Sequence, residues 1–181
     1  FVRTDERLRT NVPGVYAVGD IVPGLQLAHR GFQQGIFVAE EIAGLQPRPI
    51  DESGIPRVTY SDPEIASVGL TEAKAREQYG ADKVKTYTYN LGGNGRSQIL
   101  KTGGFVKLVS VSEGPGGDGP VVGVHMVGAR VGELVGEAQL IYNWEAYPAE
   151  VASLVHAHPT QNEAIGEAHL ALAGKPLHAH A

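Results

Sequence analysis

Two histidines separated by one alanine stand before a proline in the string His156-Ala157-His158-Pro159-Thr160-Gln161-Asn162-Glu163. Because His158 precedes Pro159, its backbone is biased towards an extended or turn conformation. Glu163 follows a little over one helical turn later, so its carboxylate can reach back to the His158 ring. A carboxylate on one ring nitrogen fixes the tautomer and raises the basicity of the other nitrogen. The spacing is compatible with a general acid–base pair, but His-Pro-Thr at a helix start is also typical of capping.

The helix that follows must position this pair. Pro159 suits the first position of a helix, because its missing N–H is no loss there. The pattern predicts a helix from about Thr160 to Ala173, with Gly174 as its stop. Its apolar stripe consists of Ala164, Ile165, Ala168 and Leu172.

A second candidate site lies near the start of the chain, where the apolar run 14–18 is closed by Gly19-Asp20. A continuous apolar run predicts a strand buried on both faces, as in a parallel sheet. Ligands of such sheets bind beyond the carboxyl ends of the strands. Asp20 could therefore accept hydrogen bonds from a sugar-like hydroxyl, although Gly-Asp after a strand is also a common turn.

A helix is predicted after this strand, from Leu27-Ala28-His29 to Ala43-Gly44. Its N-terminal amides and partial positive charge would point at whatever binds beside Asp20. His29 also has an ordinary interpretation as a solvent-facing residue at a helix start. The expected apolar stripe of this helix is Phe32, Ile36, Ala39 and Ala43.

The segment Gln46-Pro47-Arg48-Pro49 is the best domain boundary, and it divides the chain into residues 1–50 and 51–181. Beyond it we expect strands at 57–60, 64–68, 84–89, 105–111 and 121–127, and helices at 72–80, 131–144 and 148–155. Strands in succession with helices at the ends predict an α+β fold, an antiparallel sheet covered by helices. Residues 92–95 are expected to form a loop, and the glycine-rich stretch 112–120 a hairpin connection.

The composition excludes several classes of protein. The chain is 42% hydrophobic and 19% charged, as globular proteins are. A net charge of -5 without a basic run argues against nucleic-acid binding. The absence of a long apolar stretch and of a secretory signal predicts a soluble, cytoplasmic protein that does not enter a membrane.

Metal and disulfide sites are also disfavoured. The chain has no cysteine, which excludes a disulfide framework and a thiolate metal site. The histidines invite a zinc site, but the pair His156 and His158 has no third ligand at a recognisable spacing. We therefore expect no metal to bind the histidine set, which is His156, His158, His169, His178 and His180.

Three strings resemble the flavoprotein disulfide reductase family. Residues 10–20 are similar to its second flavin-binding motif, Thr-x-x-Pro-Gly-(Val/Ile)-Tyr-Ala-x-Gly-Asp, and residues 58–72 to the start of its interface domain. His-x-His-Pro-Thr-x-x-Glu resembles the C-terminal active-site motif of the dihydrolipoamide dehydrogenases within this family. The resemblance implies that residues 1–50 are a strand–helix remnant of an FAD-binding domain. Residues 51–181 would be the interface (dimerisation) domain.

The same resemblance implies roles for particular residues. Asp20 would bind the ribityl chain of FAD, and the backbone of Leu27, Ala28 and His29 the pyrimidine end of its flavin ring. His158 would take the thiol proton of dihydrolipoamide, and Glu163 would hold and polarise His158. The histidine would serve the disulfide of the other subunit of a homodimer. His156 is expected in structure or in lining a substrate channel.

The full reaction would pass electrons from protein-bound dihydrolipoamide through a cysteine pair and FAD to NAD. Because this chain lacks cysteine, it would be only the C-terminal part of the enzyme, inactive alone. Lipoyl domains and the acyltransferase core of 2-oxoacid dehydrogenase complexes are the implied partners.

Several alternatives stay open. Other disulfide reductases are the nearest alternatives. Glutathione reductases carry a second acidic residue after the glutamate, where this chain has Ala164. Mercuric reductases keep a cysteine pair near the C-terminus, and this chain has no cysteine. The family often has acidic residues before Gly35, where this chain has Phe32-Gln33-Gln34, which weakens side-chain comparisons there. A different class of function is an isolated dimerisation module without catalysis.

Overall fold

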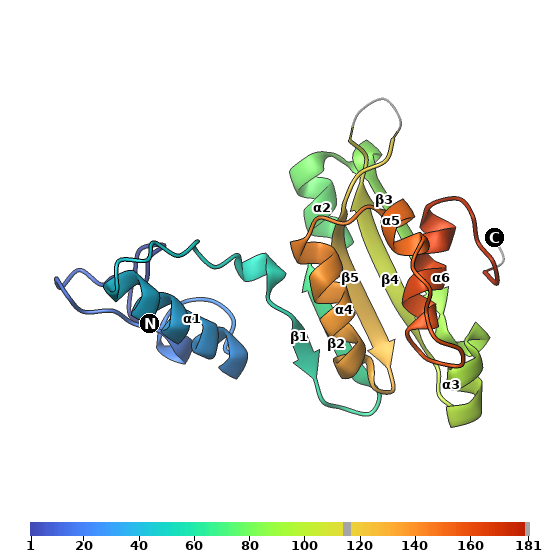
Figure 1. Ribbon diagram of the computed structural model, residues 1–181, viewed down its shortest axis with the longest axis horizontal. Helices are drawn as coiled ribbons and strands as arrows, with labels where there is room; N and C mark the ends of the chain where they lie inside the picture. Colours follow the sequence, from blue (N-terminus) through green and yellow to red (C-terminus); the bar gives the residue numbers. More distant parts are fainter. Residues whose placement is uncertain (114–116, 180–181) are drawn as a thin grey trace. The chain divides into compact units, whose positions relative to one another are not determined.

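The computed structural model describes residues 1–113 and 117–179. The chain divides into two compact units, Phe1–Ile55 and Pro56–Ala181 (Figure 1). This division lies five residues after the boundary expected from the proline-rich segment. None of the helices in the described part of the chain is long and apolar enough to cross a bilayer.

The first unit contains one α-helix, α1 (Ala28–Ile42), and two short 3-10 helices, η1 (Gly19–Ile21) and η2 (Glu52–Gly54). The strand expected at residues 14–18 is a wrong prediction. Tyr16 makes only an isolated bridge with Arg9, and Val15 is 47% exposed. A parallel strand is stabilised by neighbouring strands, and the described residues of this unit form none beside it.

Helix α1 has nearly the predicted bounds but not the predicted buried face. The expected apolar stripe is exposed, with Phe32 72% and Ile36 53% accessible. The buried side chains of α1 are instead Arg30, Gln34 and Phe37. Burial of the two polar residues is possible because both have partners within the unit: Gln34 accepts the Gly19 N–H at 2.7 Å, and Arg30 pairs with Glu52 at 2.8 Å.

The second unit is built on a five-stranded antiparallel sheet with the order β1-β2-β5-β4-β3. Its strands are β1 (Arg57–Thr59), β2 (Glu64–Gly69), β3 (Val84–Asn90), β4 (Gly104–Val111) and β5 (Val121–Gly128). Its helices are α2 (Glu72–Tyr79), η3 (Ala81–Lys83), η4 (Leu91–Gly93), α3 (Gly95–Leu100), α4 (Val131–Asn143), α5 (Pro148–Ala152) and α6 (Glu163–Leu172). The predicted antiparallel α+β fold is confirmed.

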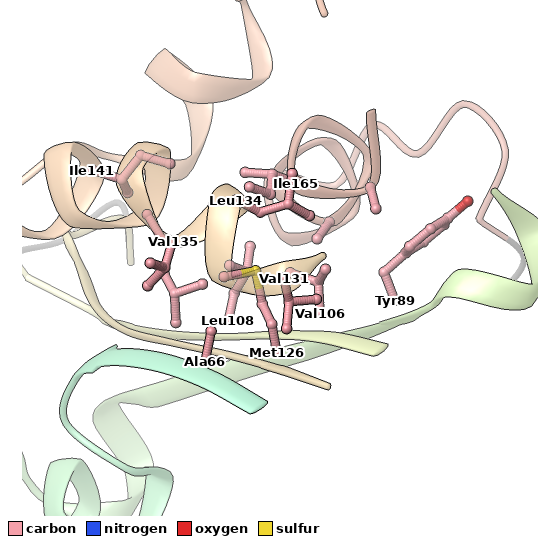
Figure 2. Packing of buried hydrophobic residues seen from close by; sticks show 14 of the residues in the cluster. Ala66, Tyr89, Val106, Leu108, Met126, Val131, Leu134, Val135, Ile141 and Ile165 are labelled. Carbon is pink, nitrogen blue, oxygen red and sulfur yellow. The ribbon is translucent and has the colours of Figure 1, made fainter. Parts of the chain in front are cut away.

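Helices pack on both faces of this sheet because alternate strand residues point to opposite sides. In β4, Val106 and Leu108 join the main core beneath α4 and α6, whereas Val109 and Val111 join a smaller cluster beneath α2. Figure 2 shows the main core, with side chains of the strands meeting those of α4 and α6. The helix predicted at 131–144 is confirmed as α4, with Leu134, Val135, Ala138 and Ile141 buried against the sheet.

Two local predictions differ from the structure. Residues 92–95 are not a plain loop: they belong to η4 and the start of α3, because the side chains of Asn90 and Asn94 accept N–H groups there. Helix α6 begins at Glu163 and not at Thr160, so Pro159 is not its first residue. The Thr160 N–H is taken by the Glu163 carboxylate at 2.8 Å, which closes a turn ahead of the helix.

Candidate active site

His158 and Glu163 are brought together at the start of α6. The Glu163 Oε1 atom accepts a hydrogen bond from His158 Nδ1 at 2.8 Å, and its Oε2 atom accepts the Thr160 N–H. Burial raises the pKa of Glu163, but the Thr160 N–H and the His158 ring outweigh this and hold the pKa below its ordinary value. The carboxylate is therefore charged at neutral pH and orients an imidazole that is 76% exposed.

The turn that carries His158 is clamped on both sides by Glu137 of α4. Oε1 of this carboxylate lies 2.7 Å from His156 Nε2, and Oε2 accepts a hydrogen bond from Asn162 Nδ2 at 2.7 Å. The His156 side chain is only 12% exposed and packs over Gly166 of α6, where a Cβ atom would lie 2.5 Å from the ring. His156 therefore has a structural place, whereas His158 stands out at the turn.

A second attachment comes from Asn94, the residue before α3. Its Nδ2 atom donates to the Thr160 carbonyl at 2.9 Å, and its Oδ1 atom accepts the N–H and the hydroxyl of Ser97. The Thr160 hydroxyl donates to the Ala157 carbonyl at 2.6 Å. The turn is thus tied to α3, to α4 and to itself, which limits the positions open to the His158 ring.

His158 and Glu163 line a cavity of about 350 Å³. Its walls come from β3, η4, α3 and α5, from the 154–158 stretch, from α6 and from residues 177–178. The lining residues are Tyr89, Gly93, Asn94, Gly95, Ala152, Leu154, Val155, His156, His158, Glu163, Gly166, Glu167, Leu170, Leu177 and His178. Burial, together with the charges of Glu167 and Glu163, raises the pKa of Tyr89. The cavity thus combines an apolar wall with a protonated phenol and a paired imidazole.

Sequence reasoning missed several residues of this site. Tyr89, Asn94, Glu137 and Glu167 were not expected there, because their partners lie on other elements. Of these, only Asn94 could have been predicted from the sequence, as a helix N-cap, because asparagine is strongly preferred at that position.

The structure places His169 in the core and not in the cavity. Its ring is fully buried, and Nδ1 donates to the Ile165 carbonyl at 2.7 Å. Burial lowers the pKa of His169 to about 4, so the ring is neutral at physiological pH. Within residues 1–113 and 117–179 no group of three or more His, Cys, Asp or Glu side chains is placed to hold a metal ion. His180 lies outside the described residues.

The four residues expected to contact a flavin lie in the first unit. Asp20 is exposed in η1, and Leu27, Ala28 and His29 form the start of α1, whose first residue has no side-chain cap. A Cβ atom on Gly31 would lie 3.4 Å from the Gly19 Cα, so α1 approaches the Gly19–Asp20 turn closely. An exposed carboxylate beside an uncapped helix start can take the hydroxyls and the polar ring edge of a flavin nucleotide.

Comparison with known proteins identifies the family. Residues 55–169 match the dimerisation domain of pyridine nucleotide-disulphide oxidoreductases, and residues 1–35 match the pyridine nucleotide-disulphide oxidoreductase domain. The chain belongs to this family. The resemblance of the His-x-His-Pro-Thr and flavin-side strings to disulfide reductases is therefore confirmed.

Individual relatives show which members of the family the chain is similar to. A dihydrolipoyl dehydrogenase of Bacillus subtilis is 42% identical over 179 residues, which cover 98% of this chain and 37% of that protein. The mitochondrial dihydrolipoyl dehydrogenase 2 of Arabidopsis thaliana is 38% identical over 178 residues, 98% of this chain and 34% of that protein. The crystal structure of LpdA from Mycobacterium tuberculosis superposes with a TM-score of 0.86 at 25% identity, covering 95% of this chain and 36% of that one.

The chain therefore corresponds to the C-terminal region of dihydrolipoyl dehydrogenases, and it spans little more than a third of their length. Its second unit is the dimerisation domain, and a fragment of the FAD domain precedes it.

Proposed function

We propose that this chain supplies the acid–base pair, part of the FAD site and the dimer interface of a dihydrolipoyl dehydrogenase. The observation that carries the proposal is the 2.8 Å contact between His158 Nδ1 and Glu163 Oε1 at the edge of a cavity. Because Nδ1 is held by the carboxylate, Nε2 is the nitrogen that would face a thiol.

In the proposed reaction His158 Nε2 takes the proton of one thiol of dihydrolipoamide. The resulting thiolate attacks a cysteine disulfide contributed by sequence outside this chain, forming a mixed disulfide and releasing a cysteine thiolate. His158 passes the first proton to the released cysteine thiolate and then takes the proton of the second substrate thiol. The second substrate thiolate attacks the substrate sulfur that is bonded to cysteine in the mixed disulfide, and the second cysteine leaves as a thiolate. The products are lipoamide and the reduced cysteine pair, so two electrons and two protons leave the substrate.

Asp20 and the Leu27–His29 backbone would hold FAD, and FAD when bound would pass the two electrons from the cysteine pair to NAD. Glu163 keeps the His158 ring in one tautomer throughout and stabilises the imidazolium that each proton transfer creates. The half-buried Glu137–His156 pair keeps the turn in place, and His156 also lines the cavity.

The dimerisation-domain match supports a homodimer. In the proposed dimer, His158 would serve the disulfide of the other subunit. The same match supports the second candidate function, a dimerisation module that does no chemistry by itself. Lipoyl domains and the acyltransferase core of 2-oxoacid dehydrogenase complexes are the proposed partners, since they carry the dithiol substrate.

The test is His158→Gln in the full-length protein that carries this sequence. We expect NADH formation from dihydrolipoamide to fall by about 10²–10⁴-fold, the usual contribution of a positioned base, while FAD stays bound. His125→Gln is the matched control, because His125 lies on the α2 side of the sheet against the Leu70 carbonyl. Unchanged turnover in the His158 variant would remove this residue from the mechanism.

A further inference from the structure

Glu167 of α6 is a buried carboxylate with an unusual set of partners. It is 6% exposed, and its Oε1 atom accepts three backbone N–H groups, from Leu177, His178 and Ala179, at 2.7–2.8 Å. Its Oε2 atom lies 3.5 Å from the ring of His178. Burial raises the pKa of Glu167, but these N–H groups outweigh it and hold the pKa below its ordinary value. The three amides therefore compensate a buried negative charge.

The chain reaches Glu167 by folding back after α6. Gly174 has a φ of 76°, the left-handed conformation that ends many helices, and the Lys175 N–H donates to the Leu170 carbonyl at 2.8 Å. Residues 174–179, which we call the strap, then return beside α6, as the red segment of Figure 1 shows. Ala179 packs against the main core, but Leu177 and His178 are 72% and 70% exposed. Apolar burial therefore holds the strap weakly, and the Glu167 carboxylate is its main attachment.

The strap forms a wall of the candidate active site. Leu177 and His178 line the same cavity as His158 and Glu163. Glu163 and Glu167 stand four residues apart on α6, so one face of the helix presents two carboxylates. One orients the imidazole, and the other holds the wall.

We propose that Glu167 is a positioning residue that sets the shape of the dithiol cavity by holding the strap in place. This inference rests on the proposed function and extends it. Leu177 would contact the aliphatic part of the dithiol, while the chemistry stays with His158 and Glu163. Loss of the Glu167 carboxylate would therefore weaken substrate binding without altering proton transfer.

The first measurement needs no activity. Amide hydrogen exchange in this chain should show Leu177, His178 and Ala179 exchanging about tenfold faster or more in Glu167→Ala, because a hydrogen bond to a charged group contributes about that factor or more. Glu133→Ala is the control, since Glu133 is an exposed glutamate of α4 and the three strap amides donate to Glu167 instead. Unchanged exchange at these three amides overturns the inference.

The second measurement separates KM from kcat in the full-length protein. Glu167→Ala should raise KM for dihydrolipoamide about tenfold and leave kcat within about twofold, which is the pattern of lost uniform binding. Leu177→Ala should raise KM while the three amides stay protected from exchange. This variant tests the cavity wall independently if Glu167→Ala does not fold. An equal KM in all variants, or a loss of kcat alone, overturns the role as a cavity wall. If the wild-type protein does not oxidise dihydrolipoamide, the proposed function fails, and the exchange measurement still decides whether Glu167 holds the strap.

Discussion

The buried imidazole of His169 makes the stability of the second unit depend on pH. Its pKa falls from an ordinary 6.5 to about 4, mainly through burial, and its Nε2 atom has no partner among the described residues. Between about pH 4 and pH 6.5, therefore, the His169 ring is protonated in the unfolded chain and neutral in the folded chain. Stability from this group is complete above about pH 6.5 and is lost as the pH falls towards 4.

The magnitude follows from the size of the change in pKa. Complete titration corresponds to about 3 kcal/mol, and about 2 kcal/mol of it is lost between about pH 7 and about pH 5. His169→Leu removes the titrating group and the unpaired nitrogen. It also removes the hydrogen bond to the Ile165 carbonyl, which contributes about 1 kcal/mol at any pH.

The assay is urea denaturation of the wild type and of His169→Leu, followed by circular dichroism at several pH values from about 7 to about 5. We expect the wild type to lose stability relative to the variant by about 2 kcal/mol over this range. Half-buried His125, whose pKa burial also lowers, is present in both proteins and cancels in the difference. His178→Leu controls for the loss of an exposed imidazole. A stability difference that stays constant across the range would refute the reasoning.

Three further predictions concern packing and assembly. Gly166→Ala should destabilise the second unit by about 1–3 kcal/mol in the same assay, because the new Cβ would lie 2.5 Å from the His156 ring. Gly136→Ala on α4 is the control: its Cβ would have nothing within 4 Å, and it should stabilise the unit by about 0.5–1 kcal/mol. Asn94→Ala should lower stability by about 1–2 kcal/mol and speed amide exchange at Ser97, whose N–H it leaves without a partner; unaltered exchange would count against the cap. Sedimentation should find this chain dimeric at micromolar concentration, and a monomer would contradict an interface built by the second unit alone.

The parts of the fold that the sequence predicts well are those set by short-range patterns. The strands predicted at 84–89, 105–111 and 121–127 and the helix predicted at 131–144 follow from short apolar runs and periodicity, and all are confirmed as β3 to β5 and α4. The His158–Glu163 contact spans five residues, so backbone geometry alone brings the two side chains within reach.

Two wrong predictions, the apolar face of α1 and the strand at 14–18, failed because the structure there depends on partners distant in sequence. The buried face of α1 is set by Gly19 and Glu52, which satisfy Gln34 and Arg30, and hydrophobic periodicity contains no information about either contact. The supposed strand at 14–18 lacks neighbouring strands in the described part of its unit. Hydrophobic periodicity predicts the buried face of a helix only where apolar contacts determine that face. In α1 the buried face is determined by hydrogen bonds and an ion pair.

The two histidines of the motif show how distant partners divide roles between identical residues. His156 and His158 are two positions apart, and each contacts a glutamate at 2.7–2.8 Å. Glu137, the partner of His156, comes from another helix and also holds Asn162, so that imidazole is fixed between two elements and is 12% exposed. Glu163, the partner of His158, belongs to the same turn, so that ring is oriented by its neighbour yet is 76% exposed. An imidazole oriented on one nitrogen and open on the other can exchange protons with a substrate, whereas the half-buried His156 mainly fixes the turn.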